Sequence, residues 1–172
     1  MKAREIRSEP FSAVEARIAV MREHIQNFPH QYVILNRLIA HIHKGIQDRY
    51  HAVLKPAGLH YTSYTALIML YGADRYTLTP SDLANSSGEK PTNITRICDE
   101  LLEKALVERH PSVDDRRRIE VTLTRRGRQL IERLQPEISR ALDELYGSFS
   151  STELKQYGAL LRRQLSAIEQ EE

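Results

Sequence analysis

The sequence predicts a mainly α-helical protein built around a winged helix-turn-helix, with amphipathic helices before and after it. Apolar residues recur every three or four positions through most of the 172 residues, which is the period of an α-helix. A short and a longer helical segment follow each other across a glycine-containing turn at residues 85–88. Two short alternating segments around a polar tip come next and predict a two-stranded β-hairpin, the wing.

Three helices are predicted before the helix-turn-helix, over residues 12–26, 31–54 and 62–72. The first ends before Pro29, because proline disfavours a helical turn in the residues that precede it. The second ends at Pro56 and Gly58, two residue types that commonly stop a helix. Thr62 or Ser63 is expected to cap the third helix.

The helix-turn-helix begins at Thr79, which is expected to cap a first helix of about two turns that Pro80 opens. A second helix begins at Pro91 and extends to about residue 105. One face of this second helix is apolar. Its opposite face presents four polar side chains, namely Thr92, Asn93, Thr95 and Arg96.

The wing is predicted from strands at residues 107–110 and 118–123. Its tip holds Asp115 followed by Arg116, Arg117 and Arg118. Two long helices over residues 124–146 and 150–168 then complete the predicted fold. Thr124 is expected to cap the first of them, and Ser150 with Glu153 matches a capping box for the second.

Composition excludes several classes of protein. The longest apolar run has six residues, at positions 66–71, whereas a membrane-spanning helix needs roughly 20. The basic N-terminus has no apolar segment behind it, so we expect no signal peptide. The single cysteine, Cys98, excludes an intrachain disulfide and fits a reducing compartment. We therefore expect a cytoplasmic protein without a membrane partner.

The charge distribution is uneven although the net charge is only +2. Residues 107–128 contain seven arginines and four acidic residues, whereas residues 132–172 contain five basic and eight acidic residues. Charge alone fits a solvated surface. After a helix-turn-helix it favours DNA, because the start of the second helix reaches base edges in the major groove and wing arginines reach phosphates or the minor groove. The candidate DNA-binding residues are Lys90, Thr92, Asn93, Thr95, Arg96, Asp115, Arg116, Arg117 and Arg118, with Asp115 as an orienter of the arginines.

Three motifs here resemble the MarR family of bacterial transcriptional regulators. They are Thr-Asn-x-Thr-Arg at residues 92–96, Asp-Asp-Arg-Arg-Arg at residues 114–118 and Leu-Thr-x-x-Gly at residues 123–127. The resemblance covers residues 31–168 and is strongest to the EmrR/MprA branch, which can carry a basic residue where this chain has Pro91. It implies a homodimer on a pseudopalindromic operator in double-stranded DNA, usually a repressor, that small aromatic acids or phenols release.

The domain assignment that follows is a single domain over residues 1–172. Residues 1–54 and 125–172 form its dimerisation helices, and residues 59–124 form its winged helix-turn-helix lobe. The resemblance places an effector pocket between these two parts. Near that junction lie His43, Tyr50, His51, Tyr61 and Tyr64, which suit a small aromatic acid or phenol of the salicylate or hydroxypyridine-carboxylate kind. An ordinary core and a polar helix flank are the alternative interpretation of these residues.

Other chemistries find little support in the sequence. Cys98 shares an apolar face with Ile94 and Leu101, which is typical of inert packing rather than of a redox sensor. No two histidines are three or four residues apart, so no local metal site is evident, and we expect no cofactor. No P-loop, nucleophile elbow or carboxylate pair is present, so we do not expect an enzyme. The alternative function is a winged-helix module that binds protein without specific DNA binding.

Overall fold

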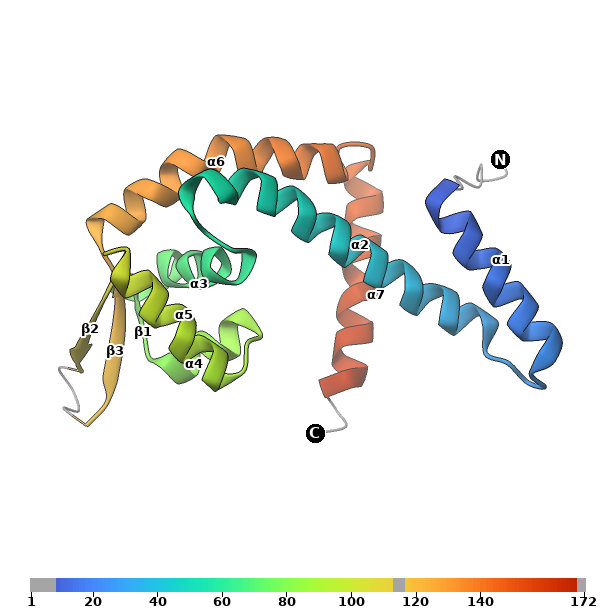
Figure 1. Ribbon diagram of the computed structural model, residues 1–172, viewed down its shortest axis with the longest axis horizontal. Helices are drawn as coiled ribbons and strands as arrows, with labels where there is room; N and C mark the ends of the chain where they lie inside the picture. Colours follow the sequence, from blue (N-terminus) through green and yellow to red (C-terminus); the bar gives the residue numbers. More distant parts are fainter. Residues whose placement is uncertain (1–8, 113–116, 170–172) are drawn as a thin grey trace. The chain divides into compact units, whose positions relative to one another are not determined.

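The structure is a computed structural model that describes residues 9–112 and 117–169 (Figure 1). In chain order the elements are α1 (Glu9–His24), α2 (His30–Leu54), the 3₁₀ turn η1 (Lys55–Ala57), α3 (Tyr61–Gly72), the 3₁₀ turn η2 (Asp74–Tyr76), β1 (Thr77–Leu78), α4 (Pro80–Ser87), α5 (Pro91–Glu103), β2 (Val107–Pro111), β3 (Ile119–Leu123), α6 (Arg125–Tyr146) and α7 (Ser151–Glu169). The chain forms two compact units, residues 1–47 and residues 48–172. The predicted mainly helical fold with a β wing is confirmed.

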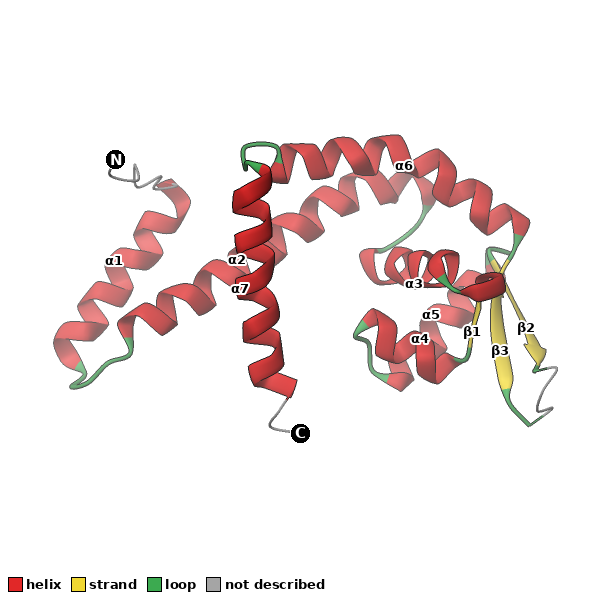
Figure 2. Cartoon of the chain, turned by 180° about the vertical axis from the view of Figure 1, so that it is seen from behind, coloured by secondary structure: helices red, strands yellow, loops and turns green. Residues whose placement is uncertain are grey.

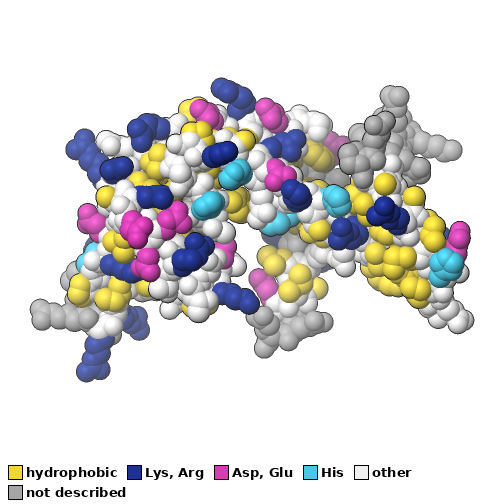
Figure 3. All heavy atoms as spheres, in the orientation of Figure 1, with side chains coloured by type: hydrophobic (Ala, Val, Ile, Leu, Met, Phe, Trp, Pro, Cys, Tyr) yellow, Lys and Arg dark blue, Asp and Glu magenta, His cyan; other side chains and the backbone are white. Residues whose placement is uncertain are grey.

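The first unit pairs α1 with the first part of α2. Phe11 and Ile18 of α1 are buried, and the Phe11 ring meets the His41 ring edge-on with centroids 5.3 Å apart. Many other apolar side chains of this unit are exposed, and Figure 3 shows hydrophobic atoms gathered over it. Those with at least two fifths of their surface exposed are Val20, Met21, Ile25, Tyr32, Leu35, Ile39 and Ile42.

The core of the second unit lies where α3, α4, α5, the sheet and α6 meet. The three helices α3, α4 and α5 and the sheet each contribute fully buried side chains. These include Leu67, Leu83, Ile97, Leu101 and Val121. Helix α6 adds Ile131 and Ile138. Figure 2 shows α3, α4 and α5 on one side of the sheet, so the three helices and the wing form one packed lobe.

The sheet has three antiparallel strands in the order β1-β3-β2. The β2–β3 pair is the predicted hairpin, with Arg109 opposite Val121. Strand β1 was not predicted. Its two residues, Thr77 and Leu78, pair with Thr122 and Val121 of β3. A strand of two residues has no measurable alternation, so only its pairing partner reveals it.

Most predicted caps are confirmed. The Thr79 side chain accepts a hydrogen bond from the Asp82 amide, and that of Thr124 accepts one from the Gly127 amide. The Ser150–Glu153 capping box also forms. The predicted cap of α3 is wrong, because the helix already begins at Tyr61 and its N-cap residue provides no side-chain hydrogen bond.

Helix α7 ends the described chain and buries none of its side chains. The sequence predicts an apolar stripe on this helix, and its leucine and isoleucine members are exposed whereas Tyr157 is half-buried. The stripe consists of Leu154, Tyr157, Leu161, Leu165 and Ile168. Leu160, outside the stripe, is exposed as well. Among the described residues, no helix is both long and apolar enough to cross a membrane.

Candidate nucleic-acid interface

Helix α5 separates a buried face from a polar face. Ile94, Ile97, Cys98 and Leu101 are completely buried in the lobe. The predicted DNA-binding residues lie on the other side, where Thr92, Thr95, Arg96 and the preceding Lys90 are exposed and Asn93 is half-buried. The structure therefore places the predicted polar set of α5 opposite its buried face, with Asn93 partly covered.

The turn between α4 and α5 depends on Gly88. Its φ of +68° lies in the left-handed region that favours glycine, and its amide donates to the carbonyls of Ala84 and Asn85. The next amide, that of Glu89, donates to the Ala84 carbonyl at 3.1 Å. This hydrogen-bonded C-cap fixes where the chain leaves α4, and so fixes Glu89 and Lys90 directly before α5.

A polar network runs along the exposed side of α5. Asn93 donates through Nδ2 to Glu89 at 2.5 Å, and its Oδ1 accepts from Nε and Nη2 of Arg96 at 3.3 and 3.0 Å. Arg96 Nη1 lies 3.9 Å from the Glu100 carboxylate, which also accepts from the buried Ser63 hydroxyl at 3.2 Å. Sequence reasoning selected Asn93 and Arg96 but missed both carboxylates.

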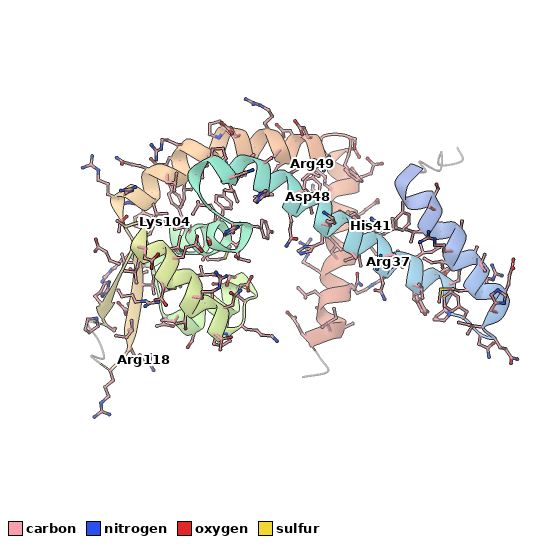
Figure 4. All side chains as sticks on the ribbon, in the orientation of Figure 1. Arg37, His41, Asp48, Arg49, Lys104 and Arg118 are labelled. Carbon is pink, nitrogen blue, oxygen red and sulfur yellow. The ribbon has the colours of Figure 1, made fainter. Side chains whose placement is uncertain are left out.

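The wing carries the remaining predicted arginines. Arg117 and Arg118 are exposed, and Figure 4 shows Arg118, directly before β3, extending away from the helices. Arg118 and Ile119 also line a groove of about 460 Å³ beside the N-terminus of α4. The predicted residues Asp115 and Arg116 lie outside the described residues.

Arg109 attaches the wing to α5. Its Nη1 donates to the Asp99 carboxylate at 2.6 Å, and its Nη2 donates to the Thr95 carbonyl at 3.3 Å. This arginine was not predicted as a site residue; it lies two residues after the buried Val107, on the same face of β2, and from there it reaches α5. The contact sets the position of the hairpin relative to the polar face of α5.

A chain of side-chain hydrogen bonds that starts at His110 crosses the three strands of the sheet. The His110 Nε2 atom lies 2.7 Å from the Thr122 hydroxyl of β3, which lies 2.8 Å from the Thr77 hydroxyl of β1. Thr77 in turn donates to the Arg75 carbonyl at 3.1 Å. Hydroxyl groups therefore connect all three strands at the base of the wing, a connection that the two-stranded prediction did not contain.

Cys98 behaves as a packing residue. Its side chain is completely buried beside Ile94 and Leu101, and burial raises the pKa of its thiol, with nearby Arg109 opposing the shift. A raised pKa lowers the fraction of the reactive thiolate at neutral pH. Both observations agree with the structural role expected from the sequence.

Three of the predicted effector residues meet in the second unit. The Tyr50 ring lies 5.2 Å from that of Tyr61 and 5.9 Å from that of Tyr64, measured between centroids. Burial, followed by the neighbouring Tyr50, raises the pKa of Tyr64 to about 12. Burial also raises the pKa of Tyr50, with further contributions from Tyr61 and Tyr146. Both shifts favour the protonated hydroxyl, which is the form that can donate a hydrogen bond.

The predicted histidines are arranged differently. His51 is exposed and its ring stacks on that of His60, with centroids 6.5 Å apart, a partner that the sequence did not suggest. His43 is exposed on α2 in the first unit. In the described part of the chain, no three His, Cys, Asp or Glu side chains are grouped so that they could hold a metal ion.

Comparison with known proteins connects this geometry to a family. Residues 57–118 match the sequence profile of the MarR family. Over 162 residues the chain is 31% identical to the transcriptional repressor MprA of Escherichia coli, covering 94% of this chain and 92% of that protein. The chain belongs to the MarR family.

Solved MarR-family structures share its fold. A mutant of MarR from Escherichia coli, complexed with operator DNA, matches with a TM-score of 0.72 and 23% identity, covering 81% of this chain and 99% of that one. BpsR of Bordetella bronchiseptica, whose DNA binding is regulated by 6-hydroxynicotinic acid, matches with a TM-score of 0.68 and 19% identity, covering 75% and 91%. Membership of the MarR family makes this protein a DNA-binding transcriptional regulator rather than an enzyme.

Proposed function

We propose that this protein is a cytoplasmic repressor that binds a pseudopalindromic operator as a homodimer and that a small aromatic acid or phenol releases. The observation that carries the proposal is the exposed polar face of α5 beside the wing arginines. Lys90, Thr92, Thr95 and Arg96 form that face, and Arg117 and Arg118 extend from the wing. The relative MprA is itself named a repressor.

The two parts of this surface have different roles in the proposal. Side chains at the start of α5 enter the major groove and contact base edges, which provides sequence preference. The wing arginines contact phosphates or the narrow minor groove beside it, which provides affinity on any sequence. Asp115 and Arg116 lie outside the described residues and stay candidates from the sequence, Asp115 as an orienter of the arginines.

The experiment that tests DNA binding is selection of duplexes from a random pool by the purified protein at moderate salt. We expect an enriched pseudopalindrome whose affinity falls steeply as salt increases, because binding releases counterions from the phosphates. Binding that is insensitive to salt and enriches no sequence would instead support the protein-interaction module.

Replacing one wing arginine tests the surface itself. Arg117→Ala should weaken operator binding by about 1–3 kcal/mol, the cost of losing one charged contact, while the melting temperature stays unchanged. Arg133→Ala is the matched control, because Arg133 is an exposed arginine of α6. Equal affinities for the two variants would remove Arg117 from the interface.

For the effector we propose the tyrosine cluster as the binding site. Tyr50, Tyr61 and Tyr64 supply aromatic faces and hydroxyl groups, and His51 supplies a ring nitrogen. This chemistry suits a carboxylate or phenolate on an aromatic ring. His43, which lies in the first unit, stays a candidate from the sequence alone. The similar protein BpsR supports this ligand class, because 6-hydroxynicotinic acid, which regulates its DNA binding, is a hydroxypyridine carboxylate.

A panel of salicylates and hydroxypyridine carboxylates tests this site. A binding compound should raise the melting temperature and lower operator affinity, and a hundredfold loss corresponds to about 2.7 kcal/mol of preference for the non-binding conformation. Tyr64→Phe removes one donor with little change of shape and should reduce the response. Tyr32→Phe, at a side chain that is 72% exposed in the first unit, is the control. A panel without any effect would contradict the assignment.

A further inference from the structure

Glu89 is an acidic residue in a surface that otherwise suits DNA. It lies half-buried directly before α5, between Gly88 and Lys90. A carboxylate there repels the phosphates of any duplex, so it lowers affinity for all sequences alike. Its contacts show what it contributes in return.

The orientation of the Asn93 amide is decided by its two partners. Glu89 Oε2 lies 2.5 Å from one end of the amide, and the Arg96 guanidinium lies 3.0 Å from the other. A carboxylate only accepts hydrogen bonds and a guanidinium only donates them. The amide nitrogen must therefore face Glu89, and the amide oxygen must face Arg96.

This orientation decides which base each side chain can contact. Asparagine recognises adenine through its oxygen and nitrogen together, but the Asn93 oxygen already accepts from Nε and Nη2 of Arg96. Arg96 keeps donors at Nη1, and its side chain is 64% exposed. Arginine donors match the O6 and N7 acceptors of guanine. The arrangement thus favours guanine at this position and disfavours adenine.

Arg96 is also held from its other side. Its Nη1 lies 3.9 Å from Glu100 Oε2, and Glu100 is anchored by the Ser63 hydroxyl of α3 at 3.2 Å and by Lys104 at 3.7 Å. Two carboxylates therefore enclose the Asn93–Arg96 pair, one from the turn before α5 and one from the helix itself. Of these two, only Glu89 acts on the amide.

We propose that Glu89 is a specificity-determining positioning residue, which fixes the Asn93 amide so that Arg96 contacts a guanine of the operator. The inference rests on the proposed operator binding and names the base that the start of α5 prefers. Two substitutions of Glu89 separate its effect on the Asn93 orientation from the effect of its negative charge. Glu89→Gln keeps an acceptor for Asn93 but removes the charge, and Glu89→Ala removes both.

The test selects duplexes with the full-length wild type and both variants, then measures binding to the selected site with its guanine replaced by adenine. We expect the wild type and Glu89→Gln to discriminate about tenfold or more, the value of a good arginine–guanine pair, and Glu89→Ala to discriminate less than about threefold. Both variants should bind random duplexes more tightly than the wild type, because both lack the carboxylate. Glu103→Gln, at the far end of α5, removes a charge without touching Asn93 and is the control.

The outcomes are distinguishable. If Glu89→Ala keeps the wild-type discrimination, or if Glu89→Gln loses it as completely as Glu89→Ala, the positioning role is wrong while operator binding stands. A wild-type motif without a discriminated guanine also overturns the role of Arg96 and Glu89. If the wild type enriches no motif, operator binding and the role of Glu89 both fail.

Discussion

Gly127 is placed where the start of α6 packs against β3 and the loop that precedes β2. A methyl group added there would meet the carbonyl oxygen of Leu106, and it would lie 2.6 Å from Leu123 Cδ1. Because a backbone carbonyl cannot move aside easily, this close approach requires glycine. The glycine in the Leu-Thr-x-x-Gly motif is therefore explained by packing, whereas the Thr124 cap one turn earlier is explained by hydrogen bonding.

We predict that Gly127→Ala destabilises the fold by about 1–3 kcal/mol, the usual cost of overpacking, although alanine favours helices intrinsically. Thermal unfolding measures the effect. Gly72→Ala is the matched control, because a methyl group at Gly72 meets nothing within 4 Å. Equal melting temperatures for the two variants would show that the lobe relaxes around the added methyl group.

The recognition helix and the wing are separate elements that side chains hold in one arrangement. Arg109 bonds β2 to Asp99 and to the Thr95 carbonyl of α5, and hydroxyl groups connect the three strands beneath it. An exposed ion pair contributes little stability, so we assign this contact to geometry rather than to folding energy. It keeps the wing arginines at a constant distance from the polar face of α5.

Helix α7 supplies a pH prediction at the scale of one element. Hydrogen bonds from the Ser150 amide and hydroxyl lower the pKa of Glu153 below its ordinary value. A carboxylate whose pKa is lower in the folded than in the unfolded chain stabilises the fold at pH values above its unfolded pKa, about 4.3. This stabilisation is lost as the pH falls from that value through the lower pKa of the folded state. The protection of the amides in the first turn of α7, measured relative to the intrinsic exchange rate at each pH, should therefore decrease on acidification through this range.

Glu153→Gln is the matched variant for that experiment, since glutamine can still accept from the Ser150 amide but does not titrate. Its first turn should exchange faster than that of the wild type at neutral pH and show a weaker response to acid. An equal acid response in both proteins would contradict the role of the capping carboxylate.

At the scale of the whole molecule, two sets of apolar side chains are exposed among the residues that the structure describes. One set belongs to α1 and the first part of α2, and the other follows α7, where Leu161 is 41% and Leu165 53% exposed. Contiguous apolar surface of this kind usually marks an interface. A two-fold dimer would cover it, and would set two recognition helices about one DNA turn, 34–36 Å, apart.

We predict that Leu165→Asp weakens dimerisation and specific DNA binding together, because one charged side chain disrupts the apolar stripe. Light scattering at micromolar concentration and binding to the selected duplex measure the two effects. Gln156→Asp adds the same charge to an exposed position outside the stripe and is the control. A wild-type monomer, or a fully dimeric Leu165→Asp, would contradict this interface. A chain that ends at Gly147 should also lose both properties.

Local chemistry made much of this protein predictable from its sequence. Some features depend only on residues within about four positions of each other, so they can be predicted from the sequence. They are the helix periods, the alternation in the hairpin and the caps at Thr79, Thr124 and Ser150. The same locality placed Thr92, Asn93, Thr95 and Arg96 on one exposed face and Cys98 on the buried one. The motifs carried by these elements also led to the correct family.

Only tertiary packing decided the contacts between segments that are distant in sequence. Thr62 or Ser63 was expected to cap α3, but the packing of α3 against α5 brings Ser63 to Glu100, 37 residues away. Strand β1, the Arg109 attachment and the meeting of Tyr50 with Tyr64 have the same origin. The contact of Glu89 with Asn93 is the exception, because the two residues are only four positions apart. The long-range contacts depend on how buried faces pack together, which no local pattern encodes.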